Sequence, residues 1–458
     1  LFDKFSLVDL FIAYTVTMSA VTTPPSAVFH RSLGKAYPTA VSGQGIYLKT
    51  KDGKLVIDGS SGAAVSCLGH GHPVVIKAIV EQAQRMAFAH TSFFTSDPAE
   101  ELAELLLNQS AGAFNNVMFL SSGSEAVESA IKLARQHHVS NGEPERINFI
   151  SRRYSYHGNT LGCLSAGFNP PRREQFAPLL SQAFHHVSPC FFSRDSSPGE
   201  AESAYVDRLL QEYEQKIQAL GPKTIAGLIV EPIGGATLGS FPSAEGYLAG
   251  LRQLCDKYGA LLLFDEVMCG MGRAGTLHAW QSLGNVAPDL QTIGKGLGAG
   301  YQPISAILVG RKVYDSIKAS QDVLPFVSGH TYQGHSIGCA AALAVQKVIV
   351  EQGLLANVEA MGKCLRNQLE ASTPHLKEVR GLGLFLTAEF KAIAGSPIAS
   401  RVAAKCLNNG AAVYLCSSAV DAVMFAPPFI ITEEEVGKLV EIFVLSVNEV
   451  LLESASTT

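Results

Sequence analysis

The sequence has no pair of cysteines at C-x-x-C spacing and no cluster of cysteine and histidine at metal-ligand spacing, although it contains nine cysteines. An odd number of cysteines without such pairs excludes a typical secreted disulfide framework and favours reduced thiols. We therefore expect a cytoplasmic protein that binds no metal. The Gly-His-Gly-His at residues 69–72 is interpreted as a turn before Pro73 rather than as a metal site.

Charge of either sign is also scarce, since charged residues make up 16% of the 458 and the net charge is −5. This balance argues against binding of nucleic acid or of an anionic membrane. No apolar run is long enough to span a membrane, because Asp3, Lys4 and Asp9 interrupt the apolar N-terminus, which also lacks the basic start of a signal peptide. We expect Met18 to be the natural start and residues 1–28 to be an N-terminal extension.

Apolar residues are abundant instead, at 47%, and the chain exceeds the size at which a single core stops growing. From about residue 116, short apolar runs such as NVMFL, IAGLIV and ALLLF alternate with helical patterns such as SEAVESAIKLARQH and EGYLAGLRQLCDKY. This alternation is typical of a mostly parallel sheet, buried by helices on both faces. It predicts a large α/β domain over residues 96–340.

The two ends of the chain have a different pattern. Helices are predicted after His72-Pro73 and Asp97-Pro98, and Asp52-Gly53 predicts a hairpin between two short strands. After about residue 340, a long helix leads to α+β segments that end in a helix near residues 433–452. We expect residues 29–95 and 341–458 to combine into a smaller α+β domain.

Four segments that could carry chemistry each follow a predicted strand, at the edge of an α/β sheet where ligands bind. Ser122-Gly123-Ser124 opens a helix, where backbone N–H groups favour a phosphate, although an ordinary helix cap with Glu125 is the alternative. Tyr156-His157-Gly158 offers an aromatic ring that could stack on a planar cofactor. The alternative there is a half-buried tyrosine beside a turn.

The third segment, Asp265-Glu266, brings an acid to the end of the apolar run ALLLF, where it is either functional or caps a helix. The fourth is Lys295-Gly296, after LQTIG. Desolvation lowers the pKa of a lysine and makes its amine a nucleophile suited to Schiff-base chemistry, whereas a surface lysine is the alternative.

In this order and spacing, the four segments resemble the class III aminotransferases, over roughly residues 29–450. The resemblance implies the aspartate-aminotransferase-like fold (fold type I), pyridoxal 5'-phosphate as cofactor, and a homodimer with shared active sites. It implies catalysis by Lys295, which forms the Schiff base, by Asp265, which keeps the pyridine nitrogen protonated, and by Tyr156, which stacks on the ring. It further implies that the cofactor is held by Ser122, Gly123, Ser124, His157, Glu231, Met268 and, from the neighbouring subunit, Thr331.

Arg380, in Arg-Gly-Leu-Gly, matches the C-terminal arginine motif of the family and is expected to bind the substrate carboxylate. Three positions differ from ornithine- and acetylornithine-type relatives. Ala236 replaces a glutamate that would pair with this arginine, Met268 replaces a glutamine, and Asn159 replaces an arginine. These differences favour ω-amine or β-amino-acid donors, with a 2-oxo acid as acceptor.

Three other activities remain open. Aminomutases and a decarboxylase of the same family share these residues. The segment GMGRAG at residues 270–275, with Asp289 about 20 residues further on, matches the dinucleotide fingerprint of an NAD-dependent dehydrogenase. The stretch after it, however, is broken by glycine and proline and does not predict a crossover helix.

Overall fold

A seven-stranded sheet forms the centre of the computed structural model, which describes residues 26–392 and 397–455. Met18 and most of the proposed extension lie outside the described residues. The strands follow the order β4-β10-β9-β8-β7-β5-β6, and all are parallel except β10. This confirms the expected α/β fold. The strands are β4 (Asn116–Leu120), β5 (Asn148–Arg152), β6 (Phe184–Val187), β7 (Ile225–Val230), β8 (Leu261–Asp265), β9 (Leu290–Ile293) and β10 (Ser305–Val309).

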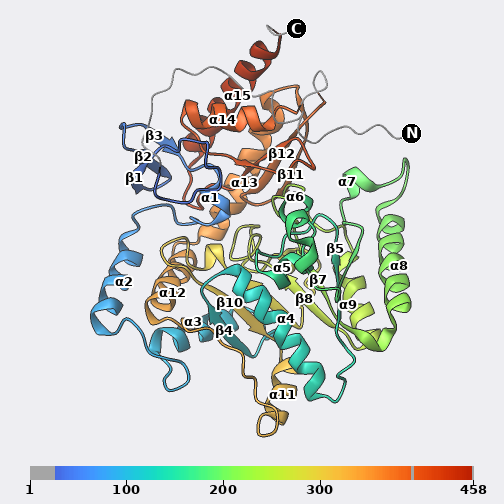
Figure 1. Cartoon of the computed structure of the whole chain (residues 1–458). Helices are drawn as coiled ribbons and strands as arrows, with labels where there is room; N and C mark the ends of the chain where they lie inside the picture. Colours follow the sequence, from blue (N-terminus) through green and yellow to red (C-terminus); the bar gives the residue numbers. More distant parts are fainter. Residues whose placement is uncertain (1–25, 393–396, 456–458) are drawn as a thin grey trace.

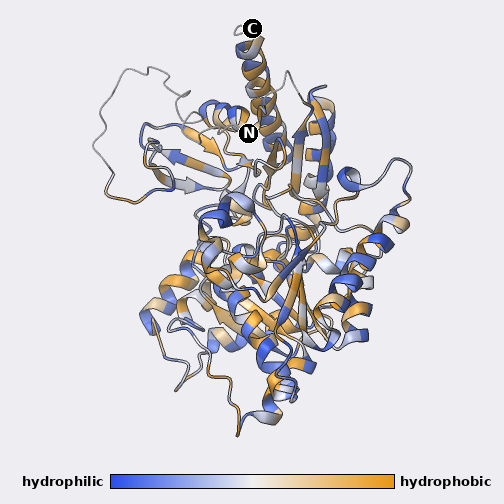
Figure 2. Ribbon diagram, turned by 45° about the vertical axis from the view of Figure 1, so that its right-hand side comes forward, coloured by the Kyte–Doolittle hydropathy of each residue, from blue (hydrophilic) through white to orange (hydrophobic). Residues whose placement is uncertain are grey.

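Helices bury both faces of this sheet, as Figure 1 shows. On β8, Leu262 and Phe264 point to one core while Leu261 and Leu263 point to another, as the two-residue repeat of a strand requires. The first core contains residues of α3 (Asp97–Asn108), α8 (Glu202–Leu220), α9 (Tyr247–Tyr258) and α12 (Ser336–Glu351). The second contains residues of α4 (Gly123–Ser140), α5 (Leu161–Ala166) and α11 (Arg311–Ser320). In Figure 2 the central strands are mostly hydrophobic, whereas hydrophobic and hydrophilic residues alternate along the outer helices.

Segments from the first and last parts of the described chain, residues 40–57, 376–392 and 397–455, pack together above the central sheet (Figure 1). Ile57 N donates to Gly410 O and Ala412 N donates to Ile57 O, both at 2.8 Å, so backbone hydrogen bonds join the first and last parts of the chain. The smaller domain, with the boundaries given above, stays a prediction. Its strands are β1 (Ala40–Gln44), β2 (Tyr47–Thr50) and β3 (Leu55–Ile57) in one antiparallel sheet, and β11 (Leu376–Leu382), β12 (Phe385–Phe390), β13 (Tyr414–Leu415) and β14 (Ala422–Phe425) in another.

Of the remaining long helices, the sequence predicted those at residues 73–85 (α2) and 433–455 (α15). It did not predict the helix at residues 354–372 (α13), nor α8 in the central part of the chain. In the part of the chain that the structure describes, no single helix is long and apolar enough to cross a membrane, and only the bent pair α12 and α13 passes by length and composition. These helices are α2 (Pro73–Arg85), α13 (Leu354–Ser372), α14 (Ala399–Asn409) and α15 (Glu433–Ala455), with short turns α1 (Ser61–Ala64), α6 (Pro170–Arg173), α7 (Phe192–Asp195), α10 (Ala279–Ser282), η1 (Glu174–Leu179), η2 (Pro222–Thr224) and η3 (Lys295–Leu297).

The GMGRAG segment does not form a dinucleotide site. After β8 the chain makes turns and the four-residue helix α10, and β9 begins at Leu290 without a crossover helix. The dehydrogenase interpretation is therefore wrong, because the fingerprint needs a helix that starts at its glycines. Arg273 of this segment instead joins three parts of the chain, since its guanidinium donates to Leu384 O and Pro427 O and lies 3.5 Å from Ser61 Oγ.

Arg273 should be important for stability. Its side chain is almost fully buried, and burial lowers the pKa of its guanidinium to about 10. Arg273→Met would leave the two carbonyls without donors and should lower the free energy of unfolding by about 1–3 kcal/mol. The control is Arg208→Met, which breaks a surface ion pair with Glu200 and should cost less than about 1 kcal/mol. Urea unfolding followed by circular dichroism measures both, and equal losses would contradict the assignment.

Candidate active site

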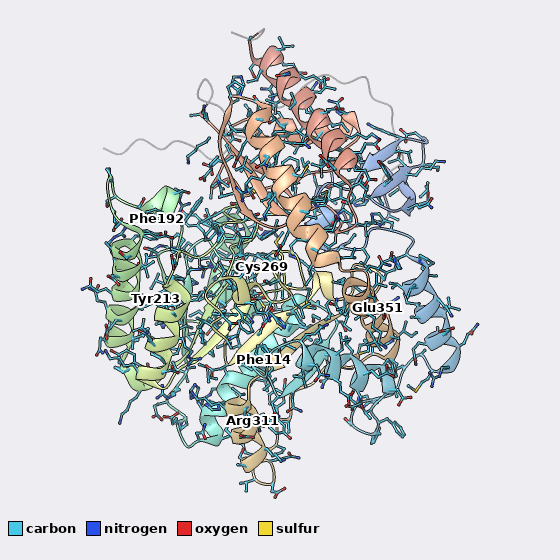
Figure 3. All side chains as sticks on the ribbon, turned by 180° about the vertical axis from the view of Figure 1, so that it is seen from behind. Phe114, Phe192, Tyr213, Cys269, Arg311 and Glu351 are labelled. Atoms are coloured by element: carbon cyan, nitrogen blue, oxygen red, sulfur yellow. The ribbon has the colours of Figure 1, made fainter. Side chains whose placement is uncertain are left out.

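A cavity of about 700 Å³ lies where the carboxyl ends of the central strands meet the smaller domain. Cys269, which lines it, is labelled at this junction in Figure 3. Nine of the eleven predicted site residues line the cavity, and only Thr331 and Arg380 do not. The nine are Ser122, Gly123, Ser124, Tyr156, His157, Glu231, Asp265, Met268 and Lys295.

The predicted phosphate turn forms the N-terminus of the 18-residue helix α4. Ser122 and Glu125 form a capping box, in which Glu125 N donates to Ser122 Oγ and Ser122 N donates to Glu125 Oε2, both at 3.2 Å. The ordinary helix cap that the sequence analysis gave as the alternative is therefore present. Gly123 is required by packing, because a Cβ there would lie 2.7 Å from Val267 Cγ1. The cap leaves the positive end of the helix dipole directed at the cavity, where it favours an anion.

Asp265, the last residue of β8, is held by three neighbours. Its Oδ1 accepts hydrogen bonds from Val267 N at 3.1 Å and Thr292 Oγ1 at 3.2 Å, and its Oδ2 lies 2.8 Å from His157 Nδ1. These three contacts fix the orientation of the carboxyl group at the edge of the cavity. His157 Nε2 is buried without a hydrogen-bond partner among the described residues. The predicted aromatic segment and the predicted acid thus form one unit.

Glu231 fixes the backbone beside Tyr156. Its Oε1 accepts from Tyr156 N at 3.2 Å and its Oε2 from Gly235 N at 2.9 Å. Burial raises the pKa of Glu231 and also that of Tyr156. The guanidinium carbon of Arg172 lies 5.1 Å from the centroid of the Tyr156 ring, within the range of a cation–π contact.

Lys295 begins the short turn η3 after β9 and has a left-handed backbone conformation, with φ of 43°. Desolvation lowers the pKa of its ammonium to about 8, because it outweighs the opposing attraction of Asp265 and Glu231. Within residues 26–392 and 397–455, no hydrogen bond or ion pair engages its Nζ. The amine is therefore available to react with a molecule in the cavity.

Two predicted residues lie outside this cavity. Thr331 is exposed, in the turn that precedes α12, and its role in a neighbouring subunit stays a prediction. Arg380 on β11 is buried and bonded to Glu378 Oε1, Glu389 Oε2 and the carbonyl oxygens of Leu238 and Gly239. The sequence shows no partner for Arg380 once Ala236 has replaced the glutamate, but the fold supplies two carboxylates, Glu378 from the same strand β11 and Glu389 from the neighbouring strand β12.

The structure adds lining residues that the sequence analysis did not identify. They include two arginines, Arg31 and Arg172, and Tyr414 on β13. The run Pro170-Pro171-Arg172-Arg173 was a visible signal, since it places two cations on a loop that follows Tyr156. Tyr414 has no such signal, because only the folding of the C-terminal part onto the cavity brings it there.

Comparisons with known proteins agree with this geometry. Residues 30–447 match the family Aminotransferase class-III. The chain belongs to this family. It is 38% identical to an uncharacterized aminotransferase of Schizosaccharomyces pombe (93% of this chain, 96% of the relative) and 35% identical to the acetylornithine aminotransferase of Clostridium acetobutylicum (91% and 97%). The solved omega transaminase of Pseudomonas jessenii in complex with PMP superposes with a TM-score of 0.86 at 34% identity (90% of this chain, 93% of that chain).

The protein is thus an aminotransferase of fold type I, and its substrates are small amines and 2-oxo acids. Class III aminotransferases depend on pyridoxal phosphate. The residues of the cavity fit this cofactor, because a free amine, a buried carboxylate and a helix N-terminus face one space. The unpartnered His157 Nε2 is a further polar atom at that site.

The pKa of Lys295 can be measured in the cofactor-free aminotransferase. Since only the neutral amine reacts, reductive methylation of Lys295 with formaldehyde should speed up about tenfold per pH unit up to its pKa and level off above it. That pKa is about 8. An ordinary lysine, with a pKa of about 10.4, would still gain reactivity beyond pH 9 or so. Mass spectrometry of the labelled peptide gives the rate, and a midpoint near that of ordinary lysines would refute the desolvation argument.

Proposed function

We propose that this aminotransferase moves the amino group of an ω-amine or a β-amino acid to a 2-oxo acid, with Lys295 as the lysine to which pyridoxal phosphate attaches. The observation that carries the proposal is the unpaired Lys295 amine, which shares one cavity with Asp265, Tyr156 and the N-terminus of α4. Bound pyridoxal phosphate would supply an electron-withdrawing ring that stabilises the charge left when a substrate C–H bond breaks.

Each side chain then has a defined task. Asp265, held by Val267, Thr292 and His157, would hold the ring nitrogen, and Tyr156 would pack on the ring. The turn at residues 122–124 would hold the phosphate. Lys295 would take up the substrate proton and return it, and with a pKa of about 8, roughly a tenth of its amine is neutral at pH 7.

The apolar wall of the cavity supports the proposed donor class. Ala236 and Met268 line the cavity and pack in one apolar cluster with Cys269 and Phe385. No carboxylate stands at position 236, and Asn159 is an amide rather than a guanidinium. Burying a second charged group of a substrate against this wall would therefore cost more than burying an uncharged chain there.

A screen of donors tests the proposal. Purified enzyme is given β-alanine, 1-phenylethylamine, ornithine or N-acetylornithine, with pyruvate or 2-oxoglutarate, and the amino acid product is quantified. The kcat/KM for β-alanine or for 1-phenylethylamine should exceed those for ornithine and N-acetylornithine by at least about tenfold.

Lys295→Ala should lower turnover at least about a hundredfold, whereas Lys77→Ala, which changes an exposed residue, should not. Carbon dioxide release or an isomerised amino acid would identify a decarboxylase or a mutase instead.

We also propose that the enzyme is a homodimer in which Thr331 of one subunit completes the phosphate site of the other. Large apolar side chains are exposed in the two segments around residues 88–94 and 323–332, where Phe93 is 78%, Val323 91% and Val327 90% exposed. The segments lie side by side, because the Phe88 and Tyr332 rings are 5.8 Å apart. An apolar patch of this kind next to Thr331 is typical of a subunit interface.

Mixed dimers test the shared site. A Lys295→Ala chain combined with a Thr331→Ala chain should regain activity, because one site of the hybrid contains an intact Lys295 and an intact Thr331. The measurement is made at a pyridoxal phosphate concentration too low to fill Thr331→Ala homodimers. The control mixes Lys295→Ala with Asp265→Asn, which leaves both hybrid sites defective, since both residues belong to the same site. Full activity of a monomer in sedimentation and assay would contradict the dimer.

A further inference from the structure

The short helix α6 carries two neighbouring arginines in different surroundings. Arg172 lines the main cavity and Arg173 does not. The guanidinium carbon of Arg173 lies 4.6 Å from the Phe168 ring centroid, whereas that of Arg172 lies 5.1 Å from the Tyr156 ring centroid. Among the described residues, no carboxylate lies within ion-pair distance of Arg172 and no hydrogen bond engages its guanidinium. Arg172 is thus a cation at the cavity whose charge is not neutralised by the protein.

Three of the other charged groups of the cavity, Glu231, Asp265 and Lys295, already have a partner or a task. Glu231 and Asp265 accept hydrogen bonds from backbone and side-chain donors, and Lys295 is the reactive amine. Arg380 does not line the cavity and is bonded to two glutamates and two carbonyl oxygens. Arg31 lines the cavity but is exposed and lies on the N-terminal segment.

A 2-oxo acid brings a carboxylate into this cavity, and that carboxylate needs a donor and a positive charge. A guanidinium meets both needs, because its parallel N–H groups match the two carboxylate oxygens. Arg172 is prepared for the task, since the contact with Tyr156 restrains its side chain. Its backbone is restrained too, by the Arg172 N to Asn169 O hydrogen bond of 3.0 Å and by the two prolines before it.

We propose that Arg172, rather than Arg380, binds the carboxylate of the 2-oxo acid and of any donor that carries one. This inference rests on the proposed function and adds to it the residue that selects carboxylate-bearing substrates. It places the carboxylate beside Tyr156, so the uncharged part of a donor is left for the apolar wall of Ala236 and Met268. The enzyme therefore accepts donors with and without a carboxylate, but its acceptor must have one.

The kinetic test compares Arg172→Met with the matched control Arg173→Met in the holoenzyme. Arg172→Met should raise KM for pyruvate and 2-oxoglutarate at least about tenfold while kcat changes less than about threefold. KM for 1-phenylethylamine, which has no carboxylate, should change less than about threefold, and Arg173→Met should leave all these constants unchanged within the same limit. An equal rise in KM for the amine and for the keto acids would give Arg172 a structural role and overturn the proposal.

A binding test separates this inference from the proposed function. Glutarate, which has neither an amino nor a keto group, is titrated calorimetrically into each holoenzyme variant, with glutaramide as the uncharged control. Arg172→Met should weaken glutarate binding at least about tenfold and leave glutaramide binding unchanged. If Arg31→Met or Arg380→Lys weakens glutarate binding and Arg172→Met does not, the inference is wrong. Failure of the donor screen would refute the proposed function, but the titration would still decide whether Arg172 binds carboxylates.

Discussion

Burial of both faces of the central sheet is the constraint from which the active site follows. Every residue of β7, β8 and β9 is buried, so a charged side chain within these strands would lose its hydration without compensation. Ionisable residues therefore appear where the strands end, as Glu231, Asp265 and Lys295 do. Since the three strands are parallel neighbours, their carboxyl ends lie along one edge, and the side chains they deliver share one cavity.

The same burial acts in opposite directions on the groups that meet there. It lowers the pKa of Lys295 to about 8 and raises the pKa of Glu231, because in each case it disfavours the charged form. An aminotransferase needs a neutral amine and an ionised acid in one space. The second acid of the cavity, Asp265, is held in place by Val267 N, Thr292 and His157. The His157 contact also joins the loop after β5 to the end of β8.

Features that depend on local pattern could be predicted from the sequence, and features that depend on packing of distant segments could not. The strand NVMFL, the helix α4 and Lys295 after LQTIG are visible because burial pattern and cap residues are local. The helix α8 was missed although Tyr205, Leu209, Tyr213 and Ile217 recur every four residues, a signal that a stricter count would detect. Tyr414 could not be assigned to the cavity, because its position depends on how the C-terminal sheet packs over the central one.

Arg380 illustrates the same limit at a single residue. Its motif indicates a guanidinium suited to a carboxylate, but the pairing of β11 with β12 decides which carboxylate it meets. The register places Glu378 directly opposite Glu389, and two like charges facing each other across a sheet destabilise it. Arg380 Nη1 lies 2.6 Å from an oxygen of each and removes this repulsion, while Lys377 contacts Glu389 from the other side at 2.7 Å. Because Glu389 is nine positions away on another strand, no local motif could show that this arginine is already engaged. A guanidinium is available to a substrate only where the fold leaves it unpaired, and in this cavity Arg172 meets that condition whereas Arg380 does not.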